Sequence, residues 1–262
     1  MSKNVIFCYS GTGNCLDLAK NIAKGIGGAD IIMMRKEPVI TDVTDADRVG
    51  FVFPCYGGGA PFDFLKYARK IKADPLAYTF AVSVSSSYPG TGLAELNKII
   101  KLDYYRAVTH QCSCIWLFPH DLMIPKLPAD KAQARSELLA IDIANRVFCC
   151  ETKNKPPKAN PANDFENKVW PKLMYKKATE FKVSDDCTGC GLCVNLCPKG
   201  NIRLLNGYAI IGTNCAQCLG CLQYCPTSAI SLGKITDKRE HYHNPNVTAA
   251  DLMEDVIHVA AE

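Results

Sequence analysis

The chain has 262 residues, of which 48% are hydrophobic and 21% charged, and its formal net charge is +4. This composition indicates a folded protein with room for one large and one small domain. No stretch reaches the ~18–20 uninterrupted apolar residues of a membrane span, and the segment MSKNVIFCYSG lacks the pattern of a secretory signal. No basic run is interleaved with stacking aromatics, as nucleic-acid binding would require. We therefore expect a cytoplasmic protein with no membrane span and no nucleic-acid partner.

Short apolar runs alternate with helix-like stretches over residues 1–150. The predicted strands cover residues 5–9, 31–34, 49–53, 79–84 and 107–116. The predicted helices cover residues 15–26, 63–71, 92–100 and 130–149. Buried runs that alternate with helices are typical of a parallel sheet covered on both faces. The pattern predicts a five-stranded, doubly wound α/β domain.

Three glycine-rich loops each follow a predicted strand. The first, over residues 10–15, opens a helix, where hydroxyls and backbone N–H groups offer an anion site without a basic side chain. It is neither a Walker A loop nor the GxGxxG pattern, so a mononucleotide phosphate is favoured over a dinucleotide. The other loops span residues 54–61 and 85–92. In an open α/β sheet such loops converge where ligands bind.

The segment 151–182 is the most basic part of the chain, with 8 basic and 4 acidic residues. Three prolines and three lysines in residues 151–163 predict a linker, and a short helix is expected over residues 165–180. The positive charge indicates either a docking patch for an acidic protein or a solvated helix face.

Eight of the 15 cysteines lie in residues 183–233, in two runs of C-x₂-C-x₂-C-x₃-C-P at 187–198 and 215–226. Cysteines three apart serve a shared ligand better than one another, so disulfides do not explain the spacing. Zinc ribbons are the alternative, but zinc prefers two CxxC knuckles farther apart. In two-cluster ferredoxins the fourth cysteine of each run ligates the other cluster. The predicted ligands are therefore Cys187, Cys190, Cys193 and Cys225 for one [4Fe–4S] cluster and Cys197, Cys215, Cys218 and Cys221 for the second.

With these parts in this order, the chain resembles the proteins of anaerobic bacteria and archaea that fuse a flavodoxin-like domain to a two-cluster ferredoxin. The resemblance implies FMN as a cofactor beside two [4Fe–4S] clusters, with residues 10–15 at the phosphate and Tyr56 and Tyr88 as candidate stacking residues. Cys15 departs from the Thr or Ser usual in flavodoxins. Three glycines at 57–59 replace a bulky aromatic, which predicts a more exposed flavin. The implied FMN-binding residues are Ser10, Gly11, Thr12, Gly13, Asn14, Cys15, Pro54, Cys55, Tyr56, Gly57, Gly58, Gly59, Ser85, Ser86, Ser87, Tyr88, Gly90 and Gly92.

The expected organisation has four parts. They are an FMN-binding flavodoxin-like domain (1–150), a basic linker and helix (151–182), an α+β ferredoxin-like domain (183–233) and a tail (234–262) that ends in an amphipathic helix over 249–259. The remaining histidines and cysteines outside the cluster runs, among them Cys8, Cys55, Cys114 and His110, are expected to be structural or surface groups.

One- and two-electron centres in one chain, without a catalytic constellation, favour an electron carrier that passes electrons between FMN, the clusters and redox protein partners. The alternatives are an FMN-dependent reductase of a small substrate fed by the clusters, and a redox-sensing or assembly subunit. The oligomeric state is left open, with a dimer among the alternatives.

Overall fold

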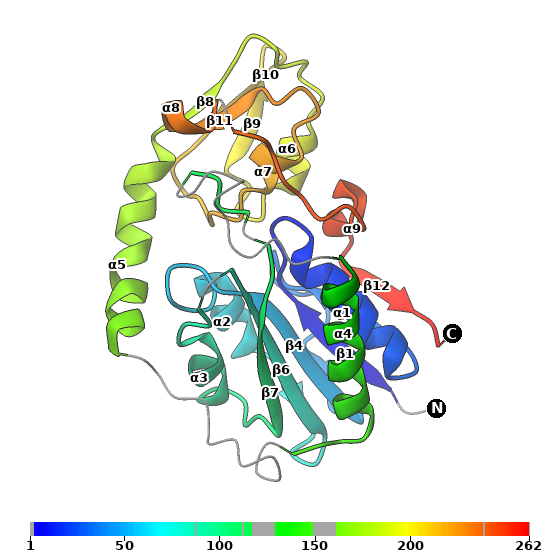
Figure 1. Ribbon diagram of the computed structural model, residues 1–262. Helices are drawn as coiled ribbons and strands as arrows, with labels where there is room; N and C mark the ends of the chain where they lie inside the picture. Colours follow the sequence, from blue (N-terminus) through cyan, green and yellow to red (C-terminus); the bar gives the residue numbers. More distant parts are fainter. Residues whose placement is uncertain are drawn as a thin grey trace.

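The computed structural model describes residues 3–86, 88–111, 113–116, 129–148, 161–237 and 239–261. Figure 1 shows two units, which we call the sheet unit (residues 3–148 with the last strand of the chain) and the cysteine-rich unit (residues 181–237). The long helix α5 (Pro161–Ala178) runs along one side of both. No helix in the described part of the chain is long and apolar enough to cross a membrane.

The sheet unit is built on five parallel strands. They are β1 (Asn4–Cys8), β2 (Ala29–Met33), β4 (Arg48–Pro54), β6 (Tyr78–Ser85) and β7 (Tyr104–Thr109). Their order is β2-β1-β4-β6-β7, which is the order of flavodoxin-like doubly wound sheets. Strand β7 lies earlier than the predicted 107–116, because Tyr104 and Tyr105 pair with Phe80 and Ala81 of β6.

Helices cover both faces of this sheet. On one face α1 (Asn14–Gly25) packs against α4 (Ala129–Ala144), and on the other lie α2 (Phe62–Ala68) and α3 (Gly92–Asn97). Helix α4 ends before the predicted residue 149, because Arg146 takes a left-handed conformation (φ 51°). A two-residue pair, β3 (Asp42–Val43) with β5 (Lys72–Ala73), lies outside the main sheet.

The tail does not form the single helix predicted over 249–259. Helix α9 (Ala249–Met253) is one short helix that begins with a capping box between Thr248 and Asp251. The chain then becomes extended, and β12 (Val256–Val259) pairs antiparallel with the edge strand β2. An edge strand has unpaired backbone groups that such an addition satisfies. The sheet therefore has six strands, one more than expected.

The cysteine-rich unit combines short strands and helices. Its elements are β8 (Phe181–Val183), α6 (Leu192–Leu196), β9 (Ile202–Leu205), β10 (Tyr208–Ile211), α7 (Gly220–Gln223), β11 (Ile230–Leu232) and α8 (Gly233–Thr236). Strand β8 pairs with β11, and β9 pairs with β10. A small core of Leu219, Leu222, Ile230 and Leu232 also takes in Ile115, which follows β7. The two units therefore share a hydrophobic contact.

Candidate functional site

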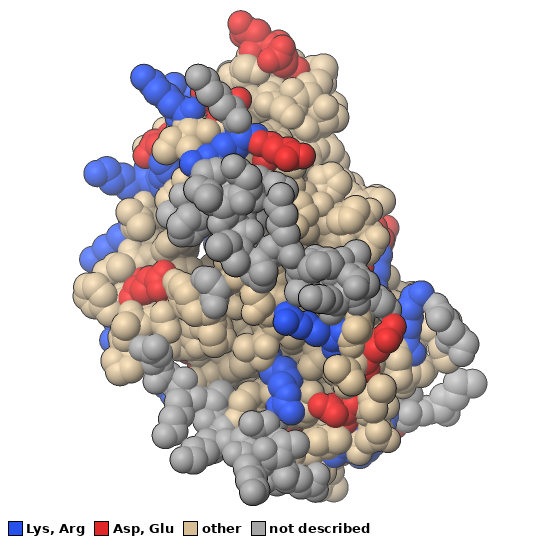
Figure 2. All heavy atoms as spheres, viewed as in Figure 1, with Lys and Arg blue, Asp and Glu red and all other residues tan. Residues whose placement is uncertain are grey.

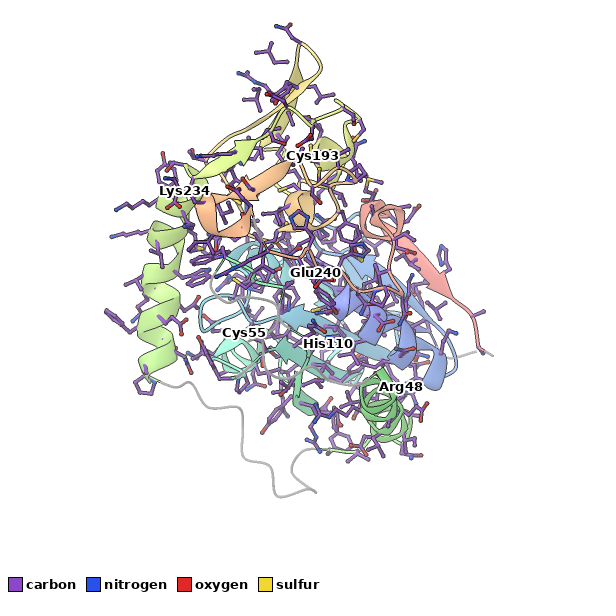
Figure 3. The ribbon with its side chains drawn as sticks, turned by 45° about the horizontal axis from the view of Figure 1, so that its top comes forward. Arg48, Cys55, His110, Cys193, Lys234 and Glu240 are labelled. Atoms are coloured by element: carbon purple, nitrogen blue, oxygen red, sulfur yellow. The ribbon has the colours of Figure 1, made fainter. Side chains whose placement is uncertain are left out.

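A cavity of about 160 Å³ lies where the sheet unit meets the cysteine-rich unit. All three predicted loops reach it, at the carboxyl ends of β1, β4 and β6. Figure 3 labels Cys55 on the sheet unit and Cys193 on α6 of the other unit, with side chains filling the region between them. The predicted residues that line the cavity are Ser10, Gly11, Thr12, Asn14, Cys15, Pro54, Cys55, Tyr56, Gly57, Gly58, Ser85, Ser86 and Tyr88.

Some predicted residues do not line it. They are Gly13, Gly59, Gly90 and Gly92, while Ser87 lies outside the described residues. These glycines serve close packing within the protein instead. A Cβ on Gly13 would lie 2.8 Å from Cβ of Asn244, and one on Gly59 would overlap the side-chain amide of Asn167.

Residues that the sequence analysis did not assign to the FMN site form the rest of the cavity wall. They are Val84, Gln111, Ser113, Cys114, Trp116, Glu166, Trp170, Gln217, Cys218 and Leu219. The sequence could have placed the loop after β7 at the cavity, because the carboxyl ends of all parallel strands meet at the same edge of a sheet. Cys114, which the sequence analysis takes as a structural or surface thiol, lines the cavity.

The first loop is shaped for a close approach between the units. Gly13 has a left-handed conformation (φ 98°) just before α1, and its N–H donates to Oγ of Ser10 at 3.2 Å. A Cβ on Gly11 would overlap the backbone carbonyl oxygen of Cys218. Hydroxyls and N–H groups at this helix start suit a phosphate. Among the described residues that line the cavity, Glu166 is the only one with a charged side chain, so none of them supplies a basic group.

Cys15 lies at the start of α1 and is only 3% exposed. Burial, and then the nearby Cys8, raise its pKa well above the usual range, so it stays a neutral thiol. A thiol is a weak hydrogen-bond donor. The departure from Thr or Ser thus removes one strong donor from the first loop.

The second loop is covered by helix α5. A Cβ on Gly57, which has φ 55°, would overlap the indole ring of Trp170. The Trp170 ring lies beside Trp116, with centroids 6.0 Å apart and planes tilted by 35°. Gly57 therefore makes room for Trp170, and Gly58 and Gly59 make room for other residues of the same helix. Helix α5 covers the loop on this side, and the exposure of a bound flavin stays a prediction.

Neutral hydrogen-bonding groups line the aromatic part of the cavity. Oη of Tyr88 donates to both carboxylate oxygens of Glu166, at 2.7 and 2.8 Å. Burial and then this hydrogen bond raise the pKa of Tyr88, which therefore stays protonated. Burial likewise raises the pKa of Cys55 to about 12.

The basic segment of the sequence falls largely on α5. The lysines of this helix are Lys168, Lys172, Lys176 and Lys177. Figure 2 shows Lys and Arg side chains along the edge of the molecule where the upper end of α5 lies in Figure 1, with acidic groups among them. Nζ of Lys177 lies 5.5 Å from the ring centroid of Trp116, so part of this charge is used for packing between the units. Residues 151–160 of the predicted linker lie outside the described residues, and 161–163 already belong to α5.

Two smaller cavities, each about 20 Å³, lie within the cysteine-rich unit. The first is lined by Cys187, Cys190, Cys193 and Cys225, and also by Cys221. The second is lined by Cys197, Cys215, Cys218 and Cys221. Each cavity thus collects three cysteines of one run with the fourth cysteine of the other. Among the described residues, no three or more His, Cys, Asp or Glu side chains are placed to hold a single metal ion.

Backbone N–H groups point at several of these sulfurs. Asn201 donates to Sγ of Cys197 at 3.2 Å, Gln217 to Sγ of Cys215 at 3.2 Å and Ala229 to Sγ of Cys225 at 3.3 Å. Hydrogen bonds to cluster sulfurs are one of the ways in which a protein sets the reduction potential of an iron–sulfur cluster. The four-cysteine donor sets and these N–H groups fit iron–sulfur clusters.

Comparison with known proteins agrees with this part of the site. Residues 181–203 match the family of 4Fe–4S binding domains. Over 61 residues, which are 21% of this chain and 79% of the relative, the chain is 36% identical to an uncharacterized ferredoxin of Methanocaldococcus jannaschii. Through its cysteine-rich part, the chain belongs to the 4Fe–4S ferredoxins. It is an iron–sulfur protein of the electron-transfer class.

Likeness to solved structures is weak. Rubredoxin:oxygen oxidoreductase of Desulfovibrio gigas has a TM-score of 0.39 at 16% identity, covering 55% of this chain and 36% of that one. The flavodiiron protein from Giardia intestinalis has a TM-score of 0.36 at 14% identity, covering 59% and 38%. The Trp repressor binding protein of Bacillus subtilis has a TM-score of 0.29 at 13% identity, covering 52% and 99%. The chain spans little more than a third of the first two, and likenesses this weak add nothing about function.

Proposed function

We propose that the chain is an electron-transfer protein that binds FMN in the cavity between its units and two [4Fe–4S] clusters in the cysteine-rich unit, and that it exchanges electrons among them and with redox protein partners. One observation carries this proposal: Cys218 lines both the large cavity and the second cysteine cavity. FMN exchanges electrons singly or in pairs, whereas each cluster takes one at a time.

The lining of the large cavity fits a mononucleotide with an aromatic ring. Ser10, Thr12 and Asn14 supply hydroxyl and amide groups at the start of α1, where a phosphate is favoured. Trp116 and Trp170 supply flat apolar surface in the same cavity. These residues would hold the phosphate and the ring, respectively, and α5 would exclude water from the ring.

The two cysteine cavities differ in their access to solvent. Cys190 in the first is exposed, whereas Cys218 in the second is buried. With the ligand sets predicted above, the second cluster would lie next to the flavin cavity and the first would lie nearer the surface. Because the rate of electron transfer falls with distance, we expect protein partners to exchange electrons with the first cluster.

Anaerobic reconstitution followed by redox titration tests this function. We expect about eight irons, eight sulfides and one FMN per chain, with flavin bands in the visible spectrum and cluster signals by EPR. Recovery of zinc in place of iron, or failure to bind FMN at saturating concentration, would contradict the proposal.

The competing function is an FMN-dependent reductase that acts on a small substrate. Such an enzyme needs an open face beside the flavin, and Trp170 over Gly57 argues against one. Reduced protein mixed with a panel of small organic and inorganic acceptors distinguishes the two functions. Fast reoxidation by one acceptor, with no protein acceptor present, would favour the reductase.

A further inference from the structure

Three backbone positions with positive φ recur in both cysteine runs. In the first run they are occupied by Gly189 (66°), Gly191 (78°) and Gly200 (57°). In the second run the equivalent residues are Gln217 (58°), Leu219 (56°) and Ser228 (53°). A residue other than glycine is strained in the left-handed region, so each of these side chains calls for a reason.

Two of these three side chains give no sign of a ligand. One is explained by packing in a hydrophobic core, and the other is exposed to solvent. Leu219 is 5% exposed and packs in the small core with Ile115 and Leu222. Ser228 is exposed and lines neither cysteine cavity. Gln217 is the exception, since it belongs to no hydrophobic core cluster among the described residues.

Gln217 lines the large cavity and also a second cavity of about 10 Å³ beside Lys177 and Phe181, and its Oε1 is buried without a hydrogen-bond partner in the described part of the chain. A buried acceptor left unsatisfied is costly, in addition to the cost of the backbone conformation. Two such costs at one residue point to a donor from outside the described residues that completes the hydrogen bond. The large cavity has room for such a donor, whereas the other cavity that Gln217 lines measures only about 10 Å³.

We propose that Gln217 is a flavin-binding residue supplied by the cysteine-rich unit, and that its side-chain carbonyl accepts a hydrogen bond from the FMN of the proposed function, on which this inference rests. Oxidised FMN offers suitable donors in the N–H of its ring and in its ribityl hydroxyls. The backbone N–H of Gln217 donates to Sγ of Cys215 at 3.2 Å. One residue therefore contacts a ligand of the second cluster through its backbone and the flavin through its side chain.

The structure provides matched variants to test this role. Gln217→Met keeps the size and the left-handed backbone but removes the acceptor. Gln217→Gly restores the residue that the first run has at this position. Ser228→Gly makes the same change to glycine at a left-handed position of the same run, away from the large cavity.

The experiment is a titration of the anaerobic, cluster-loaded protein with FMN, followed by flavin fluorescence. Both Gln217 variants should raise the Kd for FMN about 3- to 10-fold, since one hydrogen bond is lost, while Ser228→Gly should leave it unchanged. Iron content should be the same in all three. A Kd for Gln217→Met within twofold of wild type would overturn the inference alone. A wild-type protein that binds no FMN would overturn the proposed function and this inference with it.

Discussion

The α-carbon of Gly57 lies directly against the indole ring of Trp170, so close that a Cβ on Gly57 would overlap Cγ and Cδ2 of that ring. Gly57 belongs to the loop after β4, and Trp170 belongs to α5. Asn167, one turn earlier on the same helix, donates to Oε1 of Glu95 on α3 at 2.9 Å. Helix α5 is thus fitted to the sheet unit by the glycine loop and by a hydrogen bond.

Gly57→Ala should displace α5 from this loop. The new methyl group needs both the left-handed backbone and space that Trp170 occupies. Gly27→Ala is the matched control, because Gly27 also has a positive φ (85°) but nothing within 4 Å of its would-be Cβ. We expect Gly57→Ala to lower the free energy of unfolding by about 1–3 kcal/mol more than the control. If urea unfolding gave the same loss of free energy for both variants, Trp170 would not pack tightly against the loop.

Trp170→Ala should weaken FMN binding without loss of iron. The change removes flat apolar surface from the cavity and from the pair with Trp116. Aromatic pairs contribute about 0.5–1.5 kcal/mol beyond the area that they bury, so the Kd for FMN should rise about 2- to 12-fold. Phe165→Ala is the control on the same helix, since Phe165 is 69% exposed. If the two variants bind FMN equally well, Trp170 does not cover the flavin.

Paired serine substitutions test the crossed assignment of cluster ligands. Cys193→Ser with Cys225→Ser should cost one cluster, because both sulfurs line the first cavity. Cys197→Ser with Cys225→Ser should cost both clusters, because the two sulfurs line different cavities. We expect about four irons per chain in the first double variant and almost none in the second. If each run held a cluster of its own, Cys193→Ser with Cys225→Ser would also cost both clusters, and almost no iron would remain in either double variant.

Much of the fold could be predicted from local sequence. The apolar runs within β1, β4 and β6 are buried on both faces of the sheet, so their pattern alone identifies them. Strand β12 could not be found in this way. Its four residues become a strand only because β2, more than two hundred residues earlier, offers an open edge.

The site, too, has a part that local sequence predicts and a part that it does not. The loops after β1, β4 and β6 are predictable, because strand ends and glycines mark them in the sequence. The two cysteine cavities collect the ligand sets expected from spacing, and their roles as ligands stay predictions. Trp170 and Gln217 gave no local signal, since each reaches the cavity only through the docking of another element. A comparison of the two cysteine runs could have singled out Gln217, which stands where the first run has Gly189.

Asn244→Ala should loosen the tail from the first loop. Asn244 is 2% exposed, its backbone N–H donates to the carbonyl of Thr12 at 2.8 Å, and its amide donates to Oδ1 of Asn14 at 3.3 Å. Removal of the side-chain amide deletes the contact with Asn14, a second donated bond to Asp17 and the bond that its Oδ1 accepts from the backbone N–H of Asn246. It also leaves a small buried void, so we expect a loss of about 1–2 kcal/mol in the free energy of unfolding. Because Asn14 lines the large cavity, the Kd for FMN should rise as well. Asn246→Ala is the control: Asn246 is exposed, and among the described residues its side chain donates only to Asp17. The change keeps the backbone N–H that donates to Oδ1 of Asn244, so unfolding and FMN binding should both stay close to wild type. If an Asn244 variant lost stability but bound FMN normally, the tail would have a role in stability and none in FMN binding.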